Sequence, residues 1–175
     1  MSEGAAVSLI AAVDGRGALV RRDGVHFRRP AEMDRIAQLT RGRAVILGRR
    51  TFAAFAMIPP DRWYLVLTRD EDLLAEGGVR YLSGYGFWFV PCFEEALHSA
   101  RSLSRRASSP ELFVAGGPAA FGEALPLAGR VYLLPGGAPP LESGPVLPSR
   151  ATKGWRSLFA EPGGSAAFEI IERMT

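Results

Sequence analysis

The sequence predicts an α/β protein whose sheet is largely parallel, with helices on its faces. Short runs rich in Val, Ile, Leu and aromatic residues alternate along the chain with segments whose apolar residues recur at helical spacing. Such alternation is typical of parallel sheets, because each helix returns the chain across one face of the sheet. With 175 residues, 47% of them hydrophobic, the chain is long enough for one well-formed core. We therefore expect a single domain over residues 1–175.

Six segments are predicted as strands, several of them apolar on both faces. They are residues 7–13, 44–47, 63–67, 111–115, 131–134 and 168–172. The last segment follows a stretch rich in Gly and Pro, so it is a candidate for antiparallel pairing at an edge of the sheet.

Four segments between the strands are predicted as helices. They are residues 30–40, 51–56, 93–103 and 118–125. In the third, Phe93, Ala96, Leu97 and Ala100 share one face. The connection over 14–29 is long for a compact domain and we expect it to be functional. Residues 135–148 are too rich in proline for regular structure, and we expect a surface loop there.

Composition excludes several function classes. The single cysteine, Cys92, excludes an internal disulfide and a Cys-cluster metal site, and two distant histidines give a metal site little support. We expect Cys92 to be a small buried residue rather than a reactive thiol. The opening apolar run lacks a basic leader and ends at Asp14, so we expect neither a signal peptide nor a membrane span. We therefore expect the protein to be cytoplasmic. The basic residues, nearly all Arg, are spread along the chain, which only weakly supports nucleic-acid binding.

Glu32 lies in the first turn of the helix that Pro30 opens. A negative charge is favoured there by the helix dipole, which is one explanation of the residue. Glu32, Ile36 and Leu39 also stand at i, i+4 and i+7, so the carboxylate lies along an apolar stripe. Desolvation there would raise the pKa of the carboxyl group and suit it to proton or hydrogen-bond chemistry. The residues alone leave both interpretations open.

Two strand ends carry residues suited to phosphate. The strand over 111–115 runs into Gly116 and Gly117 before Pro118 opens a helix, which would let the backbone approach a pyrophosphate closely. A tight turn without a ligand explains the same pair, and the G-x-G-x-x-G fingerprint is absent.

A second strand end, over 44–47, leads into Gly48, Arg49, Arg50 and Thr51. Backbone amides, guanidinium groups and a hydroxyl would meet a phosphate together there. The strand over 63–67 ends with Thr68 and Arg69. Arginines at two neighbouring strand ends fit an additional phosphate such as the 2′-phosphate of NADPH, although simply solvated arginines remain an alternative.

Taken together, these segments resemble dihydrofolate reductase. The motifs are V-S-L-I-A-A-V-D at 7–14, P-A-E at 30–32, V-I-L-G-R-R-T-F at 45–52, P-P-D-R-W-Y-L-V-L-T-R at 59–69 and V-A-G-G at 114–117. They follow that family's order with its approximate spacing, and the resemblance extends to F-E-I-I-E-R at 168–173. It implies a dihydrofolate reductase-like α/β fold, with a central, mostly parallel eight-stranded sheet flanked by four helices.

The resemblance also implies roles for residues. Glu32 matches the family's active-site acid, which holds the pterin ring and assists protonation of N5, and Arg62 matches the arginine that binds the α-carboxylate of folate. The expected substrate-binding residues are Ile10, Phe27, Glu32, Ile36, Arg62 and Ala115. The expected cofactor-binding residues are Ala12, Leu19, Gly48, Arg49, Arg50, Thr51, Thr68, Arg69, Gly116, Gly117 and Phe121. In the family a cis peptide joins the pair matched by Gly116 and Gly117.

Several positions depart from the family's pattern. His26-Phe27 stands where Pro-Trp is usual, Ile36 where an aromatic residue often contacts the substrate, and Leu134 where a threonine bonds the acid through water. Pro118 and Phe121 replace a glycine and a tyrosine. His26 is better explained as a loop residue than as an acid. Because several departures cluster around the pterin, the resemblance implies the reductase class more firmly than the substrate.

The implied function is NADPH-dependent reduction of 7,8-dihydrofolate to 5,6,7,8-tetrahydrofolate, a step of one-carbon metabolism, with hydride added to C6 and a proton to N5. The alternatives are a reductase of a related dihydropterin such as dihydromethanopterin, a reductase of a pyrimidine-type intermediate of riboflavin synthesis, and a non-catalytic protein that binds pterin or NADPH. We expect a small-molecule substrate, NADPH as cofactor, no metal, and no nucleic-acid or membrane partner. The sequence leaves the oligomeric state open, with a monomer as the default.

Overall fold

The computed structural model describes residues 4–14, 18–19, 30–54, 59–82, 84–136, 144–162 and 168–174, with only the backbone of residues 30–32. The strands are β1 (Ala6–Val13), β2 (Ala44–Gly48), β3 (Trp63–Leu67), β4 (Gly78–Arg80), β5 (Gly86–Val90), β6 (Glu111–Gly116), β7 (Ala128–Pro135), β8 (Trp155–Ala160) and β9 (Glu169–Arg173). The helices are α1 (Pro30–Thr40), α2 (Arg49–Ala53), α3 (Glu71–Glu76), α4 (Phe93–Arg106) and α5 (Pro118–Ala124), followed by a 3₁₀ turn, η1 (Leu125–Leu127).

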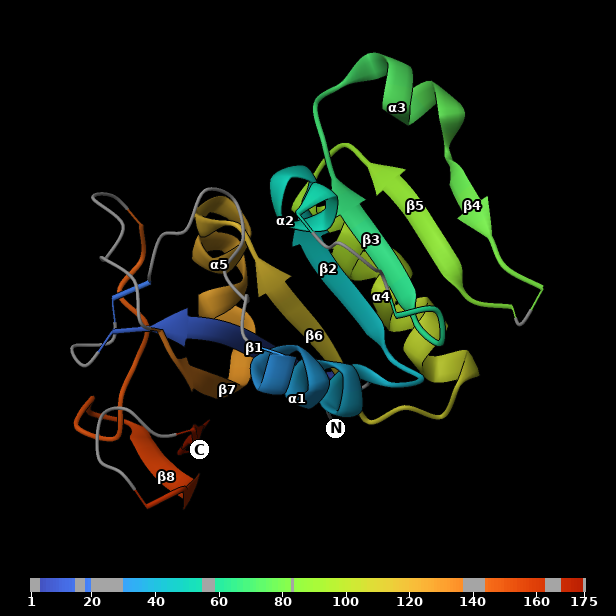
Figure 1. Ribbon diagram of the computed structural model, residues 1–175. Coiled ribbons are helices and arrows are strands. Elements are labelled where there is room, and N and C mark those ends of the chain that lie inside the picture. Colours follow the sequence, from blue (N-terminus) through green and yellow to red (C-terminus); the bar gives the residue numbers. More distant parts are fainter. Residues whose placement is uncertain are drawn as a thin grey trace.

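The strands form one sheet in the order β4-β5-β3-β2-β6-β1-β7-β9-β8 (Figure 1). Strand β1 lies parallel to its neighbours β6 and β7. Strand β2 is likewise parallel to β3 and β6, and β3 is parallel to β5. The antiparallel pairs of the described sheet are β4 with β5, β7 with β9, and β8 with β9. The predicted α/β class with a mostly parallel sheet is therefore confirmed. Antiparallel pairing of the last strand is also confirmed, but β8 rather than β9 forms the edge.

The described sheet has nine strands rather than the expected eight. The described residues also form five α-helices rather than the expected four. Helix α3 has no buried residue and hence no apolar stripe to predict it; it begins at the cap Asp70, whose side chain accepts from the Leu73 amide, and ends at Gly77. Strand β8 is exposed over most of its length and lacks the alternation of a half-buried strand. These elements depend on local caps or on pairing with distant strands.

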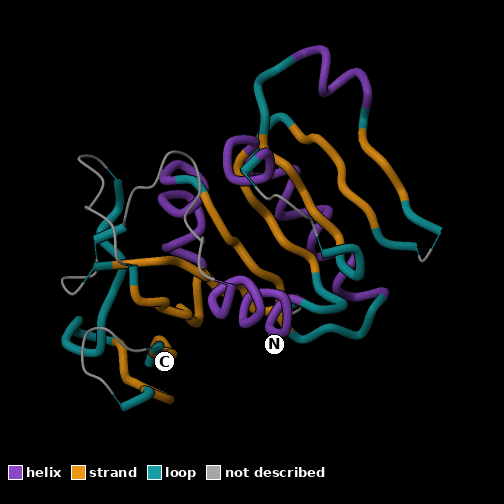
Figure 2. Tube along the Cα trace, viewed as in Figure 1, coloured by secondary structure: helices purple, strands orange, loops and turns teal. Residues whose placement is uncertain are grey.

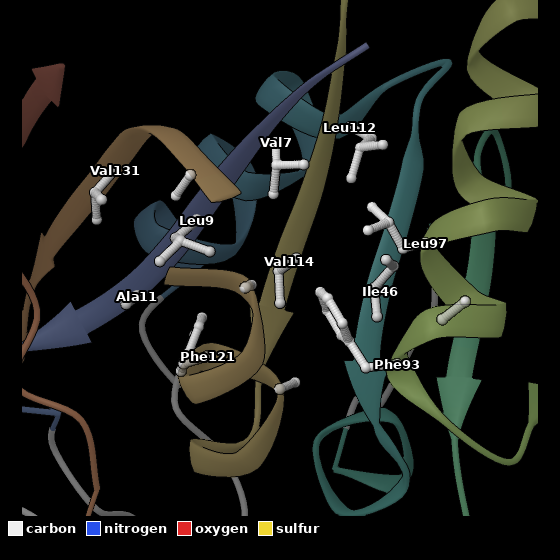
Figure 3. Packing of buried hydrophobic residues seen from close by; sticks show 14 of the residues in the cluster. Val7, Leu9, Ala11, Ile46, Phe93, Leu97, Leu112, Val114, Phe121 and Val131 are labelled. Atoms are coloured by element: carbon white, nitrogen blue, oxygen red, sulfur yellow. The ribbon is translucent and has the colours of Figure 1, made fainter. Parts of the chain in front are cut away.

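Helices cover the two faces of the sheet (Figure 2). On one face, Ile36 of α1 packs with Ile10, Ala115 and Leu134, which come from β1, β6 and β7. On the other face, α4 and α5 pack against a cluster of Val, Leu and Ile residues (Figure 3). Phe93 enters this cluster from α4 and Phe121 from α5. Both faces of the central strands are buried, as their continuous apolar runs predict.

Helix α4 confirms its predicted pattern, because Phe93, Ala96, Leu97 and Ala100 are all buried. Acidic residues occupy its first turn and arginines its last, as the helix dipole favours. The prediction for Cys92 was wrong. This residue precedes the helix as its N-cap, where the chain leaves the core, and its side chain is exposed. No helix in the described part of the chain is both long and apolar enough to cross a membrane.

Candidate functional site

The parallel strands β1, β2, β3 and β6 end at a common edge of the sheet, which we call the carboxyl edge. Helix α2 follows β2 there, α3 follows β3 and α5 follows β6 (Figure 1). In open α/β sheets, ligands bind outside the carboxyl ends of the strands. The predicted residues Gly48, Thr68, Arg69 and Gly116 all lie at this edge.

The two glycine segments contact each other at the carboxyl edge. Leu47 of β2 pairs with Gly116 of β6, and a Cβ at Gly117 would lie 3.9 Å from the Cα and N atoms of Gly48. A Cβ at Gly116 would lie 2.6 Å from both Cγ2 and Oγ1 of Thr51, too close for any side chain. The structure thus brings Gly48, Thr51, Gly116 and Gly117 together. The Thr51 side chain fills the space beside Gly116, whereas Gly48 and Gly117 approach each other through backbone alone.

The expected cis peptide between Gly116 and Gly117 is not found, since no peptide bond among the described residues is cis. Gly117 instead adopts a φ of 93°, in the left-handed region that glycine tolerates. A trans peptide is the lower-energy form, and Gly117 provides the turn from β6 into α5.

The predicted arginines lie at neighbouring strand ends, because Gly48 and Leu67 are partners in the β2–β3 pair. Arg49 Nη1 is 2.6 Å from Asp70 Oδ2, and Asp70 follows Arg69 directly. The side chains of Arg50 and Arg69 are exposed. The hydroxyl of the buried Thr68 accepts from the Asp70 amide at 3.1 Å. Asp70 was not among the predicted site residues, although it holds one of the two predicted phosphate ligands.

The substrate-binding positions expected on β1, β6 and α1 share one buried cluster. Ile10, Ala115 and Ile36 lie in it, together with Ala12. Leu134, one of the departures, is paired with Ala12 and is also fully buried. Glu32 lies in α1 one turn before Ile36, but its side chain is outside the described residues, and His26 and Phe27 lie wholly outside them.

Arg62 is buried, with 3% of its side chain exposed. Its Nη1 donates to the Ala37 carbonyl at 3.1 Å and to the Thr40 hydroxyl, both in α1, and its Nη2 donates to Asp61 Oδ1 at 2.6 Å. The hydrogen bond from Arg62 lowers the pKa of Asp61. The Nε atom of Arg62 is buried without a hydrogen-bond partner among the described residues.

Thr40 and Asp61 are residues that sequence reasoning missed at this position. The adjacent acid and base of Asp61-Arg62 were visible in the sequence. The distance from Arg62 to the end of α1 was not visible there.

The side chains of Leu19 and Phe121 lie apart from the predicted residues Ile10, Ile36 and Ala115. Both belong to the cluster beneath α4 and α5, and their exposed fractions are 2% and 1%. Leu19 forms an isolated antiparallel bridge with Val13, and Phe121 packs in α5 (Figure 3). The structure therefore does not bring their side chains to the face that holds Ile10, Ile36 and Ala115.

An aromatic group beside α2 was also missed from the sequence. Phe52 of α2 contacts Phe87 at a centroid distance of 4.9 Å and Tyr64 at 6.1 Å. The Tyr64 hydroxyl donates to the Pro59 carbonyl at 3.2 Å, and burial raises the pKa of this tyrosine. These rings form an apolar wall on the face covered by α1.

Comparison with known proteins gives one family. The sequence model described as dihydrofolate reductase matches residues 6–135. Dihydrofolate reductase of Mycobacterium leprae is 35% identical over 127 residues, which are 71% of this chain and 68% of that protein. Dihydrofolate reductase type 3 of Salmonella typhimurium is 28% identical over 127 residues, 73% of this chain and 69% of that protein. Dihydrofolate reductase of Staphylococcus haemolyticus is 26% identical over 128 residues, which are 73% of this chain and 68% of that protein. The matched region contains the whole carboxyl edge.

Proposed function

This chain belongs to the dihydrofolate reductase family and is an oxidoreductase of that type, and from this premise we propose that it reduces 7,8-dihydrofolate to 5,6,7,8-tetrahydrofolate with NADPH. One observation supports the proposal most strongly. Within the matched region, the backbones of Gly48 and Gly117 lie close together at the carboxyl edge, beside the buried Gly116. Because neither Gly48 nor Gly117 has a side chain, a pyrophosphate group could approach the backbone of these two residues closely.

Residues around these glycines fit the cofactor. When bound, NADPH supplies the hydride that adds to C6 of the pterin. Arg49 and Arg69, at neighbouring strand ends, are the proposed ligands of its 2′-phosphate, because a guanidinium fork matches phosphate geometry. When NADPH binds, Arg49 would leave the Asp70 carboxylate, to which it donates here, and pair with the 2′-phosphate instead. We also assign cofactor contacts to Ala12, Gly48, Arg50, Thr51 and Thr68, and keep Leu19 and Phe121 as weaker assignments because their side chains are buried elsewhere.

The substrate would lie between α1 and the ends of β1 and β6. Glu32 is proposed to hold the pterin through its ring N–H and 2-amino group, while N5 receives its proton from water. The carbonyls of Ile10 and Ala115 would face the rings, and Ile36 would form an apolar wall. Phe27 is proposed to contact the substrate from the preceding loop. The chain's contribution is to align two rings and exclude water from them.

The first experiment is NADPH oxidation with 7,8-dihydrofolate, followed by absorbance, beside an NADH control and a blank without pterin. We expect turnover that prefers NADPH. Glu32→Gln should still bind NADPH while losing most turnover, and Asp34→Asn, an exposed acid on the same helix, should match the unaltered enzyme. Full rates in Glu32→Gln would remove the assigned role. Tight NADPH binding without turnover on any dihydropterin would instead favour a binding protein.

A second candidate is reduction of a dihydropterin that lacks the glutamyl tail. It is favoured by the geometry of Arg62, whose Nη atoms are already bonded to Asp61, Thr40 and the Ala37 carbonyl. Arg62→Ala and Arg62→Lys separate the two candidates once thermal melting shows that each variant is folded. A large rise in KM for dihydrofolate alone supports the folate assignment. An unchanged KM for dihydrofolate favours the tailless pterin.

A further inference from the structure

An open pocket of about 860 Å³ lies at the opposite edge of the sheet from the candidate site, which we call the amino edge. Its charged lining consists of Arg43, Glu111, Arg130, Arg156, Glu172 and Arg173. Arg43 precedes β2, Glu111 begins β6 and Arg130 lies near the start of β7. Because these parallel strands end at the carboxyl edge, the amino edge pocket is separated from the candidate active site by the length of the strands.

The two carboxylates of the pocket already have hydrogen-bond donors on every oxygen. Glu111 is buried, and its Oε1 accepts from the hydroxyls of Ser8 and Tyr132, the latter at 3.1 Å. Its Oε2 accepts from Arg43 Nη1 at 3.1 Å. Glu172 Oε1 accepts from Arg130 Nε and Nη2 at 3.2 and 3.0 Å, and its Oε2 accepts from Arg156 Nη2 at 2.9 Å. The carboxylates therefore act here as supports for the arginines.

The arginines of the pocket carry more positive charge and more N–H donors than the two carboxylates can pair with. Four guanidinium groups face two carboxylates, so the lining has a formal charge of +2 (4 − 2). Each guanidinium has five N–H donors, and the bonds to Glu111 and Glu172 use only one or two of them in Arg43, Arg130 and Arg156. These side chains remain 29%, 44% and 62% exposed. Among the described residues, Arg130 also hydrogen-bonds the Tyr132 hydroxyl, and the exposed parts of the three guanidinium groups remain accessible to a ligand.

The network also limits the freedom of the guanidinium groups before any ligand arrives. Glu172 holds Arg130 of β7 and Arg156 of β8 on one carboxylate, and Arg173 stacks on the Trp155 ring at 5.0 Å while donating to the Leu125 carbonyl. Hydrogen bonds from Arg156 and Arg130 lower the pKa of Glu172, so this support stays charged at neutral pH. Preorganised donors lose less conformational entropy when they bind an anion.

We propose that the amino edge pocket binds a small multivalent oxyanion, an oligophosphate or a tricarboxylate, through Arg43, Arg130 and Arg156. Planar forks from three elements suit an anion with several charged groups better than a single phosphate or chloride. The volume is ample for tripolyphosphate or citrate. Two of the pocket's elements, β8 and β9, lie outside the region that the family model matches.

The test is calorimetric titration of the full chain with tripolyphosphate, with saturating NADP⁺ present to occupy the proposed cofactor site. We expect one site whose affinity falls at least about tenfold in Arg156→Ala and further in Arg156→Glu, since a charged fork contact is lost or reversed. The matched control is Arg80→Ala, an exposed arginine of β4 at the other end of the sheet, which should bind as the unaltered chain does. Thermal melting verifies that each variant is folded.

A parallel titration with citrate identifies the oxyanion. Tighter binding of tripolyphosphate assigns phosphate, tighter binding of citrate assigns carboxylate, and both support the pocket. Absence of binding at millimolar concentration, or equal affinity in Arg156→Glu and Arg80→Ala, would overturn the proposal and leave the network as a structural support only.

NADPH oxidation by the same variants keeps the two proposals separate. Arg156 lies outside the proposed active site, so Arg156→Ala should turn over dihydrofolate at the unaltered rate. A lack of turnover in every protein counts against the proposed function alone, because the oxyanion site is judged by the difference between Arg156→Glu and Arg80→Ala.

Discussion

Gly116 and Thr51 show how single residues shape the carboxyl edge. The chain comes so close to α2 at Gly116 that a methyl group would overlap the Thr51 side chain. Asp61 and Arg62 form a second determining pair, in which a partly exposed carboxylate neutralises a buried guanidinium. Both pairs lie in the region matched to the family, and substitutions can test the contribution of each pair to stability.

Gly116→Ala is expected to destabilise the protein by about 1–3 kcal/mol, because the new methyl group overpacks the contact with Thr51. Denaturant unfolding measures this cost. The control is Gly122→Ala in α5, where a Cβ meets no atom within 4 Å. The higher helix propensity of alanine should stabilise this variant by as much as about 1 kcal/mol. Thr51→Ala in the Gly116→Ala background should recover part of the loss. Equal stability of Gly116→Ala and the unaltered protein would show that the close approach to Thr51 does not limit residue 116.

Asp61→Asn is expected to lower stability at neutral pH and to have little effect in acid. The pKa of Asp61 in the folded chain lies below its ordinary value of 3.8, so the unfolded chain binds more protons between those two pKa values. The stabilisation is thus fully present above the ordinary value and is lost as pH falls through the folded value. Unfolding free energies of the two proteins should converge in acid. A difference that persists there would refute the ion-pair explanation, and Asp34→Asn serves as the exposed control.

At the scale of elements, short α3 depends on its ends rather than on packing. Asp70 Oδ1 accepts from the Leu73 amide at 3.3 Å, while Oδ2 holds Arg49 at 2.6 Å. One carboxylate therefore caps a helix and positions an arginine of α2. By contrast, α4 buries a continuous face against the sheet and has suitable charges at both ends.

Substitution of Asp70 separates its two roles. Asp70→Ala should cost about 0.5–2 kcal/mol through loss of the cap, whereas Asp70→Asn keeps a capping oxygen and should cost less than about 1 kcal/mol. Thermal or denaturant unfolding of both variants measures the difference. In Asp70→Asn, Arg49 no longer has to leave a carboxylate, so the Kd for NADPH should fall. Equal destabilisation by Ala and Asn would show that the cap is not the main contribution.

The whole molecule separates two kinds of surface along the strands. The carboxyl edge combines glycine backbone with arginines from α2 and the end of β3. The amino edge contains arginines and glutamates from four strands and from the loop before β2. Between them lies a core covered by α1 on one face and by α4 and α5 on the other (Figure 1). A ligand at either edge contacts several elements and should stabilise the fold as a unit.

NADPH is expected to raise the free energy of unfolding by about 2.7 kcal/mol at one hundred times its Kd, because the proposed cofactor site exists only in the folded chain. Thermal melting across a range of NADPH concentrations measures this linkage. NADH should stabilise less at the same concentration, since it lacks the 2′-phosphate. Arg69→Ala should narrow the difference between the two cofactors. Identical stabilisation by NADH and NADPH would remove the role assigned to Arg49 and Arg69.

Local patterns determined much of the fold and of the candidate site. The bounds of α1 agree with the prediction, and α4 extends only three residues beyond it, because both helices bury an apolar face that recurs at helical spacing. The central strands were predictable from continuous apolar runs. The short runs of β5 and β8 and the capped helix α3 lack such signals. Motifs at the strand ends predicted the glycines and arginines of the carboxyl edge.

Only the tertiary structure decided how these residues meet. The contact of Gly116 with Thr51 and the bonds of Arg62 to α1 join residues far apart in the chain, so no local pattern encodes them. The same holds for Glu172, which gathers arginines from β7 and β8 at the amino edge. Periodicity and propensity act over a few residues, whereas these contacts depend on strand order and register. The sequence by itself therefore determined the class of protein and the strand ends to which we assign binding, and packing decided how the side chains there are paired.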